Sequence, residues 1–202
     1  MKRTGPAVVF RDLLLGVIGI LAMALFIVLI QVSAIKKTND GQTPPGNVTV
    51  FITWPTGDND VDLWVMGPGE KRPVGYSNKG GALWNLLRDD LGNASDNSNV
   101  NMESAYSRGA PAGEYQANLH CYRCGTVPQI VQVEVGLNDG KGAGTVVIAT
   151  ATVSLMANGQ ERTAVRFKID AAGKFVPGSI NAVFKPLRSA TVASPAQPET
   201  WP

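Results

Sequence analysis

The chain has 202 residues, of which 44% are apolar and only 17% charged, and its formal net charge is +2. This length accommodates one domain and an appendage. Basic and acidic side chains are equal in number beyond Ile35, so that part of the chain has no excess positive charge for phosphate contacts. The composition therefore argues against a nucleic-acid-binding protein, a disordered chain and a fully soluble cytosolic protein.

The most apolar part of the chain lies near its N-terminus. Residues 13–35 are interrupted only by Gln31 and Ser33. At about 1.5 Å per residue, this run is long enough to cross a hydrocarbon core of roughly 30 Å. A cleaved signal peptide is the alternative, because residues 32–34 are similar to a small-residue cleavage site. Signal sequences have shorter apolar regions of about 7–15 residues, so the sequence predicts one uncleaved transmembrane helix.

The start of this run carries an acidic residue, Asp12. Carboxylates in or near a membrane span are candidates for function. Asp12, Gly16, Gly19 and Met23 fall on one face at helical spacing, and the two glycines would let another helix approach closely. The alternative is an ion pair between Arg11 and Asp12 at the level of the lipid headgroups, without further function.

This N-terminal pattern resembles the B subunits of ion-driven membrane motors, which include MotB, ExbD, TolR and ZorB. The similarity covers residues 8–35. It implies that two copies of the helix lie inside a ring of five multi-span A subunits, and that Asp12 carries a transported H⁺ or Na⁺. It also implies a bacterial inner-membrane protein with residues 1–12 in the cytoplasm and a periplasmic C-terminal domain. The excess of Lys and Arg before the span favours the same orientation. The chain lacks the peptidoglycan-binding OmpA-like pattern and the ExbD-like α/β pattern.

After a polar linker at residues 36–47, apolar residues recur with a period of two, which is typical of strands. Residues 83–91 fit a strand or a short helix, residues 93–101 an exposed loop, and residues 189–202 a disordered tail. The segments that we expect to form strands are 48–53, 61–66, 74–77, 114–122, 130–137, 145–155 and 162–169. The sequence therefore predicts an all-β outer domain, an antiparallel β-sandwich over residues 48–188.

Two motifs in this domain resemble secreted bacterial β-sandwich modules, namely pre-peptidase C-terminal domains and YfaP-like domains. The first is the Asp-x-Asp-Leu-x-Val strand at residues 60–65, and the second is the Gly-Glu-Tyr strand at residues 113–115. The resemblance implies a sandwich fold. It indicates little about function, because such sandwiches have many roles.

Three acidic residues at alternate positions, Asp58, Asp60 and Asp62, are candidate ligands for Ca²⁺, which prefers oxygen ligands. The segment lacks the glycine and the distal glutamate of an EF-hand. The alternative is that Asp58 and Asp60 shape a turn and Asp62 faces solvent.

Cys121 and Cys124 are the only cysteines, and His120 is the only histidine. A zinc site would need further ligands, and neighbouring strand residues point to opposite faces, so His120 and Cys121 make a poor pair of ligands. The sequence predicts a structural disulfide between Cys121 and Cys124, formed in an oxidising compartment.

No nucleophile–base arrangement is evident, and the glycine-rich segment 138–144 lacks the spacing of a phosphate-binding loop, so we do not expect an enzyme. Trp54, Trp64, Trp84 and Tyr76 fit a core better than a sugar-stacking platform. The sequence favours a dimeric motor subunit that binds no cofactor, except for a candidate Ca²⁺. The alternative is a membrane-tethered sandwich that binds a cell-envelope polymer, such as peptidoglycan, or an envelope protein.

Overall fold

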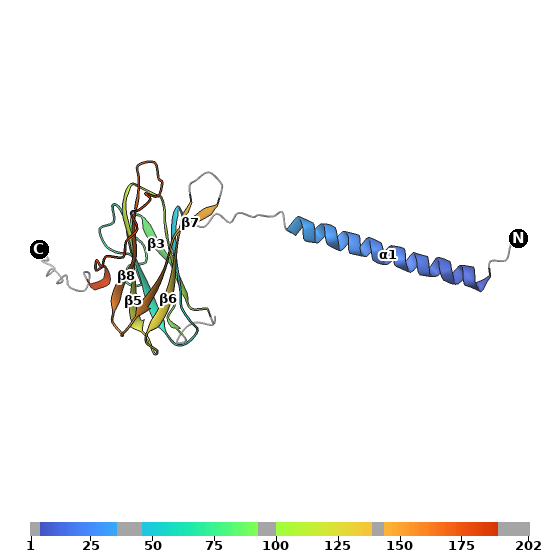
Figure 1. The fold of residues 1–202 in the computed structure, drawn as a ribbon, viewed down its shortest axis with the longest axis horizontal. Coiled ribbons are helices and arrows are strands. Elements are labelled where there is room, and N and C mark those ends of the chain that lie inside the picture. The colour runs from blue at the N-terminus through green and yellow to red at the C-terminus, as the bar shows by residue number, and fades with distance from the viewer. Residues whose placement is uncertain (1–4, 36–45, 93–99, 139–143, 190–202) are drawn as a thin grey trace, which may run out of the picture. The chain divides into compact units, whose positions relative to one another are not determined.

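The computed structural model describes residues 5–35, 46–92, 100–138 and 144–189, and the chain divides into two units (Figure 1). Among the described residues, the first unit contains helix α1 and the second contains the eight strands. Most of the predicted linker and tail, and most of the loops expected at 93–101 and 138–144, lie outside the described residues.

Helix α1 spans Pro6–Ile35. Proline is favourable at the first helical position, because its fixed φ suits the helix and its missing N–H would have no partner there. The segment Val8–Ile27 is long and apolar enough to cross a membrane, a property that membrane spans and signal sequences share. The helix begins before residue 13, so Asp12 has apolar residues on both sides of it within the helix.

The second unit is built from two antiparallel sheets. One sheet has five strands in the order β3-β4-β1-β6-β7, and the other has three in the order β2-β5-β8. The strands are β1 (Val48–Thr53), β2 (Asp60–Met66), β3 (Trp84–Arg88), β4 (Met102–Ser107), β5 (Gly113–Arg123), β6 (Gln129–Asn138), β7 (Thr145–Leu155) and β8 (Glu161–Ile169).

Alternating side chains from both sheets form one hydrophobic core. Val48, Val50 and Ile52 of β1 are almost completely buried, as are Val61 and Leu63 of β2. Aromatic side chains also belong to this core: the Trp84 ring packs edge-on against Tyr115, which in turn stacks on Phe167. The prediction of a mostly β outer domain with antiparallel strands is therefore confirmed.

Of the two structures that residues 83–91 fit, a strand or a short helix, the strand is present as β3. The strands differ from the predicted ones in two places. Strand β4 was not predicted, because Glu103 and Ser107 on its buried face break the apolar alternation. Residues 74–77, predicted as a strand, make only isolated bridges, between Val74 and Val65 and between Gly75 and Asn78.

Both edges of the three-stranded sheet are paired with irregular segments of the same chain. At the β2 edge, Val65 and Val74 exchange two backbone hydrogen bonds of 2.8 and 2.9 Å. At the β8 edge, Arg166 does the same with Asn181, at 2.7 and 2.9 Å. These bridges satisfy backbone groups that an edge strand would otherwise leave open.

The Glu161 carboxylate holds the segment that follows β8 against the sheet. It accepts hydrogen bonds from the backbone N–H groups of Leu187, Arg188 and Ser189, and from the side chains of Ser189 and Asn118. Burial alone would raise the pKa of Glu161, but these hydrogen bonds to the charged form outweigh burial and lower the pKa below its ordinary value of 4.5.

Candidate functional site

The outer face of the three-stranded sheet is polar and yet buried. Asp62 on β2 lies opposite His120 on β5, with Oδ2 of Asp62 2.7 Å from Nδ1 of His120. Both residues are at most 3% exposed. Burial raises the pKa of Asp62, although the hydrogen bond with His120 acts in the opposite direction. One interpretation of the sequence was that Asp62 faces solvent. That interpretation is wrong, because Asp62 is buried.

Glu103 on β4 reaches across to the edge of β2, next to the part of that edge that Val74 pairs. Its Oε2 accepts the backbone N–H of Leu63 at 2.7 Å, and its Oε1 accepts the N–H of Asp90 at 3.3 Å. Glu103 is completely buried. This burial raises the pKa of Glu103 well above its ordinary value, since a low dielectric disfavours the charged form.

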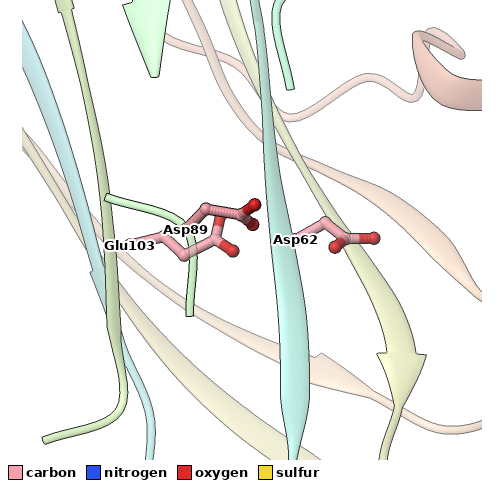
Figure 2. Close-up of side chains that lie close together, drawn as sticks. All are labelled: Asp62, Asp89 and Glu103. Atoms are coloured by element: carbon pink, nitrogen blue, oxygen red, sulfur yellow. The ribbon is translucent and has the colours of Figure 1, made fainter. Parts of the chain in front are cut away.

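Asp89 completes a group of three carboxylates with Asp62 and Glu103. One oxygen from each lies within 4.8 Å of the other two. Figure 2 shows Asp89 and Glu103 side by side next to the strand that carries Asp62. The Asp89 Oδ2 also accepts from Nζ of Lys79 at 2.8 Å. Two strands and the segment after β3 thus bring together acids that are far apart in the sequence.

Asp60 lies next to this cluster in a pocket of about 200 Å³. It is 4% exposed, and its buried Oδ1 has no hydrogen-bond partner. Burial, and then the charge of Asp62, raise the pKa of Asp60 to about 7. The residues that line the pocket are Asp60, Asp62, Tyr76, Lys79, Asp89, Leu91 and Tyr122.

The three aspartates that the sequence offered as a metal site are separated by the fold. Asp60 and Asp62 share the pocket, whereas Asp58 is exposed and forms an ion pair with Arg123 at 2.8 Å. Asp58 does not line the pocket. The residues that sequence reasoning missed are Asp89 and Glu103, which replace Asp58 as neighbours of Asp62.

No family model, curated protein or solved structure matches the chain. The two candidate functional sites of the chain are the acidic pocket and the helix face that carries Asp12.

On helix α1, Asp12 is exposed and lies 3.3 Å from Nη2 of Arg11. Gly16 and Gly19 follow Asp12 within the same helix and carry no side chain. Small residues of this kind allow the backbone of another helix to approach closely.

The predicted disulfide is present and joins Cys121, near the end of β5, to Cys124. Its two cysteines are at most 5% exposed. The backbone N–H of Cys124 donates to Oδ1 of Asn158 at 2.6 Å, which fixes this turn beside the β7–β8 connection.

In protein purified from the cell envelope, we expect both cysteines to resist alkylation under denaturing conditions until a reductant is added. The physical reason is that disulfide sulfurs are not nucleophilic thiolates. The measurement is the mass of the denatured chain after iodoacetamide treatment, with and without prior reduction. Two adducts without reductant would show free thiols and would contradict export to an oxidising compartment.

Trp54 and Trp84 belong to the hydrophobic core as predicted, whereas Trp64 is buried outside that core and packs against Tyr76. Tyr76 has a different environment. It packs edge-on against Trp64 and Tyr122, and it lines the acidic pocket.

Proposed function

We propose that the chain is the B-type subunit of an ion-driven membrane motor, with Asp12 as the ion carrier. The observation that supports this function is the position of Asp12 inside the apolar helix. The segment able to cross a membrane begins at Val8, so Asp12 lies about 6 Å along the helix axis from its start. A carboxylate within a span is costly, which favours a functional role.

The face around Asp12 supports the same proposal. Gly16 and Gly19 follow Asp12 at i+4 and i+7, and neither of them carries a side chain on this face of the helix. A second helix can approach this face closely, and a ring of partner helices can then surround the pair. The partner is a multi-span A-type subunit, and the transported ion is H⁺ or Na⁺.

In this proposal the second unit is a periplasmic β-sandwich that transmits the work or holds the cell wall or an envelope protein. The disulfide between Cys121 and Cys124 supports a periplasmic location, because disulfides persist in oxidising compartments.

A membrane-tethered binding module without ion transport is the second candidate. The acidic pocket favours it, because Tyr76 and Tyr122 line this pocket together with three carboxylates. Pockets that combine aromatic walls with a few converging polar groups are typical of binding sites.

The motor predicts a defined stoichiometry. When the chain is co-expressed with the product of a neighbouring gene for a multi-span protein and extracted in mild detergent, we expect two copies of the chain with about five of the partner. The expected ratio follows from two B helices inside a ring, and native mass spectrometry measures it. Recovery of the chain as a monomer without a partner would contradict the motor.

A further inference from the structure

We infer that the acidic pocket beside β2 binds one Ca²⁺ ion through Asp60, Asp62 and Asp89, which line it, with the adjacent buried carboxylate of Glu103 as a further ligand. This site lies in the second unit and does not depend on the proposed motor function.

The spacing of the three carboxylates fits one ion of this size. Ca²⁺ binds oxygens at about 2.3–2.6 Å, so two ligands on opposite sides of the ion are separated by about 5 Å. The oxygens of Asp62, Asp89 and Glu103 lie within 4.8 Å of one another. Mg²⁺ usually keeps several of its waters and binds only one or two carboxylates, and Zn²⁺ is bound mostly through nitrogen and sulfur, so four neighbouring carboxylates favour Ca²⁺.

Charge supports the same assignment. Lys79 and His120 each contact one carboxylate of the cluster, Asp89 and Asp62 respectively. Glu103 is completely buried, and its oxygens accept hydrogen bonds from the backbone N–H groups of Leu63 and Asp90, while its carboxyl group lies against that of Asp89. Lys79 and His120 thus leave part of the negative charge of the three carboxylates without a positively charged partner, and a bound divalent cation would neutralise it.

Asp60 provides an observation that is independent of the cluster. Its side chain is more than nine-tenths buried, lines the same pocket, and has one oxygen without a hydrogen-bond partner. A buried carboxylate oxygen without a donor is unfavourable. A cation in the pocket would supply the missing partner.

The pocket also has room for the rest of a Ca²⁺ shell. Its volume of about 200 Å³ accommodates several waters, which would complete the six to eight oxygens that the ion takes. The Lys79 side chain is 60% exposed, so its ammonium group is able to leave Asp89 when the ion binds.

The test is a calorimetric titration of CaCl₂ into the full-length protein in detergent, after treatment with EDTA. We expect one ion per chain, and Asp89→Asn should weaken binding by about tenfold or more, because a ligand is lost. Asp58→Asn is the matched control, since Asp58 is exposed and outside the pocket, and it should bind as the wild type does. No binding of Ca²⁺ at millimolar concentration, or equal binding by Asp89→Asn, would overturn the site.

Two further measurements do not depend on the folding of Asp89→Asn. Lys79→Met removes the competing cation and should tighten Ca²⁺ binding, so an unchanged affinity would count against the site. Tb³⁺ is a luminescent substitute for Ca²⁺, and Tyr76 and Tyr122 line the pocket. Excitation of the tyrosines should therefore produce Tb³⁺ emission that CaCl₂ quenches. Emission that CaCl₂ leaves unchanged would place the ion elsewhere.

Discussion

Asp12→Asn is expected to abolish the cellular function of the chain while leaving its membrane insertion, abundance and partner binding intact. Asparagine keeps the shape and the hydrogen bonding of aspartate, but its amide cannot take up and release a proton or balance the charge of Na⁺. The driving force that the motor would lose is about 2.3 kcal/mol per charge for each 100 mV. The measurement is complementation of a deletion strain, recorded beside protein level and recovery of the complex.

Asp12→Glu is the matched variant, because it keeps the charge and moves it by one methylene, and it should retain part of the function. The tethered binding module predicts a different outcome. There Asp12 is paired with Arg11 among the headgroups, which solvate either side chain, so Asp12→Asn would be silent. Full function of Asp12→Asn at normal abundance would remove the motor and leave the binding module.

Glu161→Ala is expected to lower the free energy of unfolding by about 3 kcal/mol. The variant loses five hydrogen bonds to a carboxylate and removes a partner of the buried Asn118 amide. Urea denaturation of the detergent-solubilised chain, followed by tryptophan fluorescence, measures the change. Glu134→Ala is the control, because Glu134 is exposed on β6, and it should change stability by less than about 0.5 kcal/mol. Equal stability of both variants would show that the segment after β8 does not stabilise the domain.

The same carboxylate makes stability depend on pH. Because the pKa of Glu161 is lowered in the folded chain, the unfolded chain takes up its proton first as the pH falls. The contribution of Glu161 is therefore complete above its unfolded pKa and is lost as the pH falls below about 4.5 through the lower folded value. Glu114 adds a similar loss, because the hydrogen bonds from Arg166 lower its pKa. The difference between wild type and Glu161→Ala should consequently shrink in acid.

The sequence predicted the strands whose apolar side chains alternate. Val48, Val50 and Ile52 alternate with polar or half-buried neighbours, so β1 was evident. Strand β4 was not, because its inward-facing positions include Glu103 and Ser107. The local sequence pattern around Glu103 cannot show that Leu63, on a strand of the other sheet, donates its backbone N–H to this buried carboxylate.

The acidic pocket was predicted only in part for a related reason. The sequence indicates Asp58, Asp60 and Asp62 as candidate ligands because they occupy alternate positions. In the fold, Asp60 and Asp62 are buried, whereas Asp58 is exposed. Asp89 and Glu103 come from other segments, and only the pairing of β3 with β4 and the packing of β4 against β2 bring them to Asp62. Such proximity depends on topology, which spacing along the chain does not encode.

The bridges at the two edges of the three-stranded sheet restrict how another polypeptide could bind there. Strand addition to a sheet requires a row of free backbone donors and acceptors along an edge. Val74 occupies part of the β2 edge together with the Glu103 carboxylate, and Asn181 occupies part of the β8 edge. An extended peptide therefore cannot add a strand to this sheet without displacing a segment of the chain itself. The covered edges also protect the domain against edge-to-edge aggregation.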